Sequence, residues 1–595
     1  MNTSVMGFML AWLLVAVPVA AAPSSPYAVH FERSVAVPMR DGVTLRADVF
    51  RPDVPGKFPV LLQRTPYDKN YVTEFGLKAA AQGYVVIVQD VRGRFSSEGE
   101  WYPFRHESDD GYDTIEWAAA LPYSTGQVGM FGGSYVGATQ MLAAVAHPPH
   151  LAGICPAITA SDYHENWTYQ GGAFQQWFAE TWTSLALSRD TLSRAVGRYT
   201  NAVNTPGPQS LQNLPLAEYP LYRFDGVPAL STGFLAPYFR DWLAHPDHDA
   251  YWNAISIEDR YPQIDVPALH IGAWYDIFLG GTLRNYLGIR DRGGSDAARR
   301  GQRLIVTVGG HAGNGPRIGA LDFGPAAPFD GDELTIRWYD FLFRHVNNEF
   351  ATGKPVTLFV MGANQWRQED AWPLARARAT KYYLHTAGHS LSTAPPANEQ
   401  PDRYLYDPAD PVPTIGGPLC CEALPTGTGP QDQRPVEARS DVLVFTAKAF
   451  TTDTEVTGPV SLDLYVATSA ADTDFTGMLI DVWPDGFAQN LTGGILRLRY
   501  RNSMEKPQQA VPGQVYHVTL DLWATSNLFR SGHRLRLEVS SSNFPRFDRN
   551  LNTGELQATA TRLLTATNTV YHDRRYPSAL IVPLVPVPAR HADSQ

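Results

Sequence analysis

The sequence predicts an α/β protein with a parallel sheet and helices on both of its faces, followed by a β-rich domain. Short apolar runs such as 84–89 alternate with helical runs such as 107–120 in the first part of the chain. Residues 160–250 break this alternation and lack a strong strand signal, which indicates a mostly helical insertion. From residue 352, short β-rich runs separated by turns dominate, which is typical of a β-sandwich such as a jelly roll.

The elements of the sheet follow from local patterns. Asp41-Gly42 is a turn signal between two alternating runs and predicts a hairpin at 36–49. The continuous β-branched run 84–89 predicts a strand that is buried on both faces. The other expected strands are 59–63, 128–131, 151–158, 266–271 and 303–308, and the expected helices are 107–120, 135–146, 282–289 and 332–346.

The C-terminal region is predicted from its short strands. These are 356–361, 381–385, 442–447, 460–467, 476–483, 514–522 and 533–540. The predicted domains are a signal peptide (1–22), an α/β domain in two parts (23–159 and 251–350), a helical cap insertion between them (160–250) and a β jelly-roll domain (351–595).

Composition limits the function classes. The 595 residues are roughly three to four domains in length, and 44% hydrophobic content is ordinary for globular domains. The net charge is −11 and no basic block occurs, so nucleic acid is not an expected partner. Aromatic residues make up 12% of the chain, and we expect many of them to line cores or an apolar substrate cavity.

The N-terminus has the features of a secretory signal peptide. Residues 7–22 are apolar and end in small residues, with Val19 and Ala21 suitably placed for cleavage. We expect a periplasmic or secreted protein that has no membrane association after signal removal. No Lys or Arg precedes the run, and an uncleaved anchor is the alternative.

The three cysteines give no metal-binding pattern. Cys155, Cys420 and Cys421 contain no C-x-x-C pair, so we expect no zinc site and no other metal or cofactor. Cys420 and Cys421 could form a vicinal disulfide, either could reach Cys155, or all three could be free.

A strand, two glycines, a serine and a helix follow one another around Ser134. This is the layout of a nucleophile elbow, in which a sharp turn lifts the hydroxyl clear of the sheet. The N-terminus of the following helix directs N–H groups and positive charge at an oxyanion. The motif departs from G-x-S-x-G, because Val136 occupies the position of the second glycine and Gly137 follows it.

Four chemically useful side chains follow predicted strands, where the active sites of α/β sheets collect. They are Tyr67, Ser134, Asp276 and His311, and the last three occur in the order used by α/β-hydrolases. Ser134 needs a base, His311 would be that base, and Asp276 would hold the imidazole in its productive tautomer. The backbone N–H of Tyr135 and the hydroxyl of Tyr67 would bind the oxyanion. Tyr67 as a turn residue and Asp276 as a helix N-cap are the structural alternatives.

Several motifs occur in a fixed order along the chain. They are Arg64-x-Pro-Tyr67, 89–94 with 97–99, 110–113 with Trp117, Gly132-x-Ser-Tyr-x-Gly137, 272–276 and Gly310-His311. Together they resemble the cocaine-esterase-like acyl hydrolases, which group with X-Pro dipeptidyl-peptidases, α-amino-acid ester hydrolases and glutaryl-cephalosporin acylases. The resemblance covers nearly all of the mature chain, and the Ser-Tyr-x-Gly spacing is that family's own.

The resemblance implies an α/β-hydrolase domain with a helical cap, followed by a jelly roll. It implies the triad Ser134, Asp276 and His311, with Tyr67 and Tyr135 forming the oxyanion hole.

The acyl pocket is expected to be apolar. Residues 277–279 are Ile-Phe-Leu, where α-amino-acid ester hydrolases carry carboxylates for the substrate ammonium group. Phe278 matches an aromatic residue that lines the acyl pocket of cocaine-esterase-like enzymes, and Trp167 is a second pocket candidate. Asp162 and Glu165 keep an alternative open, in which they recognise a charged amino-acyl group.

The sequence therefore predicts a secreted serine hydrolase that cleaves small carboxylic esters through an acyl-enzyme. The first alternatives are X-Pro dipeptidyl-peptidase, α-amino-acid ester hydrolase or β-lactam acylase activity on the same scaffold. A different class is a secreted β-sandwich binding protein with a relic hydrolase, against which the intact Ser, Asp, His and Tyr argue.

Overall fold

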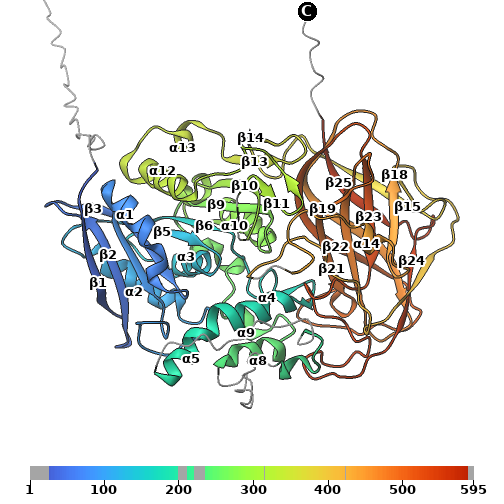
Figure 1. Ribbon diagram of the computed structural model, residues 1–595, viewed down its shortest axis with the longest axis horizontal. Helices are drawn as coiled ribbons and strands as arrows, with labels where there is room; N and C mark the ends of the chain where they lie inside the picture. Colours follow the sequence, from blue (N-terminus) through green and yellow to red (C-terminus); the bar gives the residue numbers. More distant parts are fainter. Residues whose placement is uncertain are drawn as a thin grey trace, which may run out of the picture.

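The computed structural model describes residues 26–197, 211–219, 235–311, 313, 315–421 and 424–586. The predicted signal peptide, residues 1–22, lies outside the described residues. Two sheets lie side by side, with a layer of helices below them in the view of Figure 1. Among the described residues, no helix has both the length and the apolar character needed to cross a membrane.

The first sheet has ten strands in the order β1-β2-β4-β3-β5-β6-β9-β10-β13-β14. The strands from β4 to β13 in this order are parallel, as predicted, and an antiparallel hairpin and strand β14 form the two edges. The strands are β1 (Val29–Pro38), β2 (Thr44–Pro52), β3 (Phe58–Thr65), β4 (Val85–Asp90), β5 (Ser124–Gly133), β6 (Leu151–Ala157), β9 (Leu269–Tyr275), β10 (Arg303–Gly310), β13 (Val356–Val360) and β14 (Gln365–Glu369).

Helices cover both faces of this sheet. In β4, Val85 and Ile87 pack in one apolar core with α2 (Glu107–Ala119) and α3 (Tyr135–Val145). Val86 and Val88 point to the opposite face, where they pack with α1 (Thr73–Ala81) and α12 (Gly331–Arg344). The alternation of side chains along a strand explains why the run 84–89 is apolar throughout. Helix α10 (Leu279–Arg292) follows β9, and α11 (Asp296–Arg300) and α13 (Glu349–Thr352) are short connections.

The insertion between β6 and β9 is mostly helical. It forms the lower layer in Figure 1 and contacts both the first sheet and the β-domain. Its elements are β7 (Tyr169–Gln170), β8 (Ala173–Phe174), α4 (Gln176–Thr181), a π-helical turn (Trp182–Leu187), α5 (Ser188–Val196), α8 (Pro237–Ala244), α9 (Ala250–Asn253) and the 3₁₀ turns Leu216–Glu218 and Glu258–Gln263.

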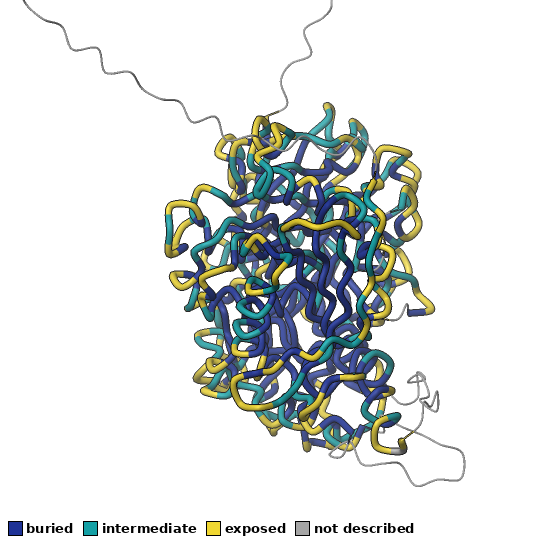
Figure 2. The backbone as a smooth tube through the Cα atoms, turned by 90° about the vertical axis from the view of Figure 1, so that its left-hand side faces the viewer, coloured by how far each residue is buried: buried dark blue, intermediate teal, exposed yellow. Residues whose placement is uncertain are grey.

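The C-terminal domain is mostly β, as predicted. Its eleven-stranded sheet runs in the order β17-β24-β19-β25-β15-β16-β18-β23-β20-β21, and β22 pairs with β19. Because β22 also packs against β21, the sheet closes over one large apolar core. Figure 2 shows the molecule from the side of the first sheet, with buried backbone in the middle and exposed loops around it. The strands are β15 (Arg378–His385), β16 (Ser390–Ser392), β17 (Asp402–Tyr406), β18 (Leu443–Ala447), β19 (Thr454–Thr468), β20 (Asp474–Val482), β21 (Ala488–Arg497), β22 (Tyr516–Phe529), β23 (Arg534–Ser540), β24 (Ala566–Tyr571) and β25 (Ala579–Val585).

The first sheet extends beyond the expected domain boundary at 350/351. Strand β13 pairs in parallel with β10, with Leu304 opposite Val356, so β13 and β14 belong to the first sheet. The first sheet therefore continues to Glu369. An apolar run such as 356–361 predicts a strand, but the run itself does not specify the sheet that the strand joins.

Candidate active site

Ser134 lies on a strained turn between β5 and α3. Its φ of 61° and ψ of −130° are unusual for a residue with a side chain and cost on the order of 1–3 kcal/mol. The Ser134 N–H donates to the carbonyl of Ala157 on β6 (3.0 Å), and its own carbonyl accepts from the N–H of Gly137 (2.9 Å). At Gly132, where φ is 120°, a Cβ would lie 2.5 Å from the Val136 side chain, so glycine is required there.

His311 bridges the serine and an aspartate. Its Nε2 lies 3.0 Å from Ser134 Oγ, and its Nδ1 lies 2.7 Å from Asp276 Oδ1. Asp276 follows β9 and is fully buried, and its other oxygen accepts the N–H of Phe278 (3.1 Å). Asp276 therefore holds both the histidine and the turn that leads into α10. The three residues that the sequence selects meet at the carboxyl ends of β5, β9 and β10.

Tyr67 lies beside the serine. Burial raises the pKa of Tyr67 to about 12, so the phenol keeps its proton at neutral pH. Its hydroxyl interacts with the Ser134 hydroxyl and with the backbone N–H of Tyr135, and both contacts lower the pKa. The two expected oxyanion donors therefore lie close together. A third contact was not expected from the sequence: the indole Nε1–H of Trp182 donates to Tyr67 Oη (2.9 Å).

A buried charge network anchors the Tyr135 side chain below the serine. The Tyr135 hydroxyl donates to Glu107 Oε1 (2.8 Å) and accepts from the N–H of Phe104 (2.8 Å). Glu107 in turn pairs with the buried guanidinium of Arg64 (2.7 Å). Desolvation raises the pKa of Glu107 and of Tyr135. This network fixes Tyr135, the first residue of α3, whose backbone N–H lies beside the Tyr67 hydroxyl.

An aromatic wall stands next to the histidine. Phe278 and Trp167 are fully buried and stack with ring centroids 4.3 Å apart and planes 8° apart. The Phe278 ring also meets the His311 ring edge-on at 5.2 Å. Of the two predicted pocket residues, Phe278 therefore contacts His311 directly, and Trp167 packs against Phe278.

Asp162 does not offer a free carboxylate. Its Oδ1 accepts the backbone N–H groups of His164 and Glu165, and its Oδ2 accepts from Ser256 Oγ (2.7 Å) and from His248 Nε2 (3.0 Å). Burial raises the pKa of Glu165 to about 7, and one of its oxygens accepts from the N–H of Gly171. Asp162 therefore stabilises the insertion and has no acceptor left for a substrate ammonium group.

The cysteines follow one of the expected arrangements. Cys420 and Cys421 form a vicinal disulfide, and Cys155 is free and buried. In the part of the chain that the structure describes, no three His, Cys, Asp or Glu side chains form a group able to hold a metal ion.

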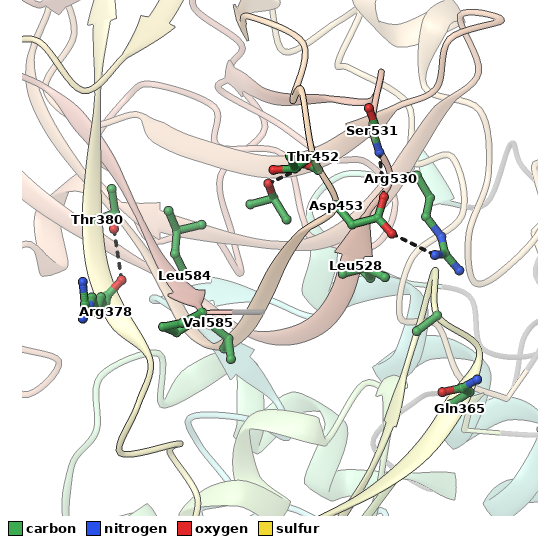
Figure 3. A pocket seen from close by; sticks show the side chains of 13 residues that line it. Gln365, Arg378, Thr380, Thr452, Asp453, Leu528, Arg530, Ser531, Leu584 and Val585 are labelled. Carbon is green, nitrogen blue, oxygen red and sulfur yellow. Dashed lines mark hydrogen bonds and ion pairs between the residues drawn. The ribbon is translucent and has the colours of Figure 1, made fainter. Parts of the chain in front are cut away.

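A large groove lies elsewhere, on the β-domain (Figure 3). Its volume is about 1130 Å³, and it is lined by the ends of β15, β19, β22 and β25 together with Gln365 of β14. Asp453 in this groove pairs with Arg530, and no member of the Ser134 constellation is among its lining residues. The groove therefore contributes nothing to the chemistry at Ser134.

A serine on a strand–helix turn, hydrogen-bonded to a His and through it to an Asp from the ends of later strands of a mostly parallel sheet, is typical of a serine hydrolase of the α/β-hydrolase fold. Residues 41–313 match the model of the X-Pro dipeptidyl-peptidase (S15) family, and residues 348–581 match its C-terminal non-catalytic domain. The chain belongs to this family.

Individual relatives agree with this assignment. The cocaine esterase of Rhodococcus sp. is 39% identical over 581 residues, which cover 93% of this chain and 98% of that protein. An α-amino acid ester hydrolase has a TM-score of 0.78 at 26% identity, over 96% of this chain and 99% of that one. An aminopeptidase from a marine sediment archaeon (Thaumarchaeota archaeon) has a TM-score of 0.77 at 25% identity, with the same coverage.

The pair between Asp162 and His248 predicts a pH-dependent stability. Asp162 raises the pKa of His248 to about 9, so the pair stabilises the fold fully below the unfolded value of about 6.5 and is lost as the pH rises through 9. We expect His248→Gln to lower the Tm by about 2 °C more at pH 6 than at pH 10. Ser256→Ala is the matched control, because it removes another Asp162 partner that does not titrate. An equal shift for His248→Gln at the two pH values would contradict the assignment.

Proposed function

We propose that this serine ester hydrolase is an acyl esterase that works through an acyl-enzyme on Ser134. The observation that carries the proposal is the continuous hydrogen-bonded chain from Ser134 Oγ through His311 to Asp276, with distances of 3.0 and 2.7 Å. Such a chain turns an ordinary hydroxyl into a nucleophile at neutral pH.

The reaction has two stages, acylation of Ser134 and hydrolysis of the acyl-enzyme. His311 Nε2 takes the proton as Ser134 Oγ attacks the ester carbonyl, and Asp276 stabilises the imidazolium through Nδ1–H. The oxyanion accepts hydrogen bonds from Tyr67 Oη–H and from the backbone N–H of Tyr135. When the tetrahedral intermediate collapses, the C–O bond of the ester breaks and His311 protonates the departing alcohol. Water then attacks the acyl-enzyme with His311 as the base, and collapse of the second tetrahedral intermediate releases the acid and restores the Ser134 hydroxyl.

The wall beside the base favours an uncharged acyl group. The stacked rings of Phe278 and Trp167 place apolar side chains and no counter-ion beside His311, and both oxygens of Asp162 already accept hydrogen bonds, including those from His248 and Ser256. The 39% identical relative is named a cocaine esterase, which supports an ester as the substrate. Dipeptide release is the second candidate, because the family model and the archaeal structural relative are named as peptidases.

The nucleophile can be identified by covalent labelling. We expect a fluorophosphonate to label the wild-type protein and to leave Ser134→Ala unlabelled, because Ser134 has both a histidine within hydrogen-bonding distance and two candidate oxyanion donors beside it. Ser392 is a demanding control, because it has the same kind of partners as Ser134. Ser392 Oγ lies 3.0 Å from His385 Nε2, and His385 Nδ1 lies 2.7 Å from Glu399 Oε1.

Ser392 Oγ, however, accepts the N–H of Ala394 in a local turn of the β-domain. Ser392→Ala should therefore keep full labelling and activity. Labelling that persists in Ser134→Ala and disappears in Ser392→Ala would overturn the assignment.

Loss of the Tyr67 hydroxyl should slow the chemical step. We expect Tyr67→Phe to reduce kcat on the order of 10²–10³-fold with little change in KM, because one oxyanion donor is removed. Tyr71→Phe provides the control, since Tyr71 lies nearby in the 3₁₀ turn Lys69–Val72 and is 84% exposed. A loss below tenfold in Tyr67→Phe would remove Tyr67 from the oxyanion hole.

Substrate class can be tested by direct comparison. We expect p-nitrophenyl butyrate to be hydrolysed with a kcat/KM at least about a hundredfold above that for Ala-Pro-p-nitroanilide, since a free ammonium finds no available carboxylate at Asp162 and since an ester is the more reactive acyl donor. Equal or faster turnover of the dipeptide anilide would favour the peptidase.

A further inference from the structure

The hydroxyl of Tyr67 is held from the insertion. Trp182, whose Nε1–H donates to Tyr67 Oη (2.9 Å), is the first residue of the π-helical turn Trp182–Leu187. Its indole is 1% exposed and stacks between Phe178 (5.5 Å) and Trp242 (6.0 Å), both of them in the insertion. The indole is therefore fixed by residues of the insertion, while its N–H reaches a residue of the α/β domain.

This contact fixes the direction of the Tyr67 proton. A phenol has one proton to donate, and its oxygen can also accept hydrogen bonds. The indole N–H of Trp182 donates to a lone pair of the Tyr67 oxygen. The Tyr67 proton therefore cannot point at the indole. The oxygen's other neighbours are the Ser134 hydroxyl and the Tyr135 N–H, and only the Ser134 oxygen can accept, so the proton points toward Ser134 Oγ, beside which an oxyanion would form. The indole contact also lowers the pKa of Tyr67, which makes the phenol a better donor.

Arg94 ties the Tyr67 loop to the same π-helical turn. Its Nε donates to the carbonyl of Pro66 (2.9 Å), the residue directly before Tyr67. Its Nη1 donates to the carbonyl of Leu187 (2.7 Å), at the end of the turn that Trp182 begins. Asp190 of α5 lies 3.6 Å away as the counter-ion, and the Arg94 side chain is fully buried. A planar guanidinium can satisfy both carbonyls at once, which an ammonium group cannot do with the same geometry.

A second tie holds the neighbouring loop. The backbone N–H of Phe95 donates to Asp190 Oδ2 (2.9 Å), and Arg194 donates to the Phe95 carbonyl (2.7 Å). The segment after β4 is therefore clamped on α5 from both sides of its backbone. The position of the insertion is transmitted to Tyr67 through fixed hydrogen bonds.

We propose that Trp182 and Arg94 are positioning residues of the oxyanion hole, so that the docked insertion completes the catalytic site as well as covering it. The inference rests on the proposed function, because it assumes that Tyr67 donates to the oxyanion. Trp182 holds the hydroxyl and its proton direction, and Arg94 holds the backbone that carries Tyr67.

A double-mutant cycle tests Trp182. Trp182→Phe keeps an aromatic ring in the stack and removes only the N–H and part of the ring area. We expect it to lower kcat about tenfold with little change in KM. In a Tyr67→Phe background, which has no hydroxyl to position, the same substitution should change kcat less than about twofold.

The control is Trp252→Phe in the same insertion. It removes an equivalent indole hydrogen bond, from Trp252 Nε1 to the carbonyl of His245 (2.8 Å), without contact with Tyr67. We expect kcat to stay within about twofold of wild type. An equal loss of kcat in Trp182→Phe with and without the Tyr67 hydroxyl would show a merely structural role and overturn the proposal, as would a loss in Trp252→Phe as large as that in Trp182→Phe.

Affinity for phenylboronic acid gives a second readout, because its tetrahedral adduct with Ser134 places an oxygen in the oxyanion hole. We expect its Kd to rise in Trp182→Phe by about the factor by which kcat falls. Arg94→Lys should show the same parallel change, and an unchanged Kd in both variants overturns the inference. If Tyr67→Phe alone costs less than tenfold, the oxyanion assignment itself fails. If Tyr67→Phe costs the expected factor and the cycle is additive, only the positioning role fails.

Discussion

The hydrogen bond between His311 Nε2 and Ser134 Oγ joins residues 177 positions apart in the sequence. It can form because β5, β9 and β10 are parallel and end at the same edge of one sheet, so that the loops after them meet. The Ser134 turn adds the other requirement, since its positive φ lifts the hydroxyl toward the ring. The strained turn is stabilised by the hydrogen bond from the Ser134 N–H to the carbonyl of Ala157 on β6. It also requires Gly132, where a Cβ would clash with the Val136 side chain. A rigid sheet edge therefore supplies the precision that a proton transfer over 3.0 Å requires.

The other two parts of the chain brace this edge. The β-domain contacts the end of β9 at Tyr275, the residue directly before Asp276. The Tyr275 hydroxyl donates to the carbonyl of Asn490 (2.9 Å). It also reaches the segment that follows His311, where the N–H of Ala320 donates to the carbonyl of Pro430 (2.9 Å). The insertion holds the opposite side of the site through the indole of Trp182. The site thus lies where three structural units meet.

Much of this arrangement follows from the sequence, because strand ends can be read from apolar runs and α/β topology brings those ends together. The strand-end positions of Ser134, Asp276 and His311, their order and the family resemblance together predict the three side chains that the structure places within hydrogen-bonding distance. The role of Trp182 could not be predicted, since an insertion rich in Trp gives no sign of which indole N–H faces a tyrosine. The local sequence pattern also does not show which sheet the strand at 356–361 joins, because its partner, β10, lies about 50 residues earlier in the chain. The role of Asp162 was equally hidden in the sequence, because its hydrogen bonds with His248 and Ser256 depend on residues about 90 positions away.

The most direct test of the account is a crystal structure of the adduct with phenylboronic acid, a mimic of the tetrahedral intermediate. The account predicts a covalent bond from boron to Ser134 Oγ and one boronate oxygen about 2.7–3.1 Å from both Tyr67 Oη and the Tyr135 backbone nitrogen. Boron bonded to another residue, or a boronate oxygen directed away from both donors, would contradict it.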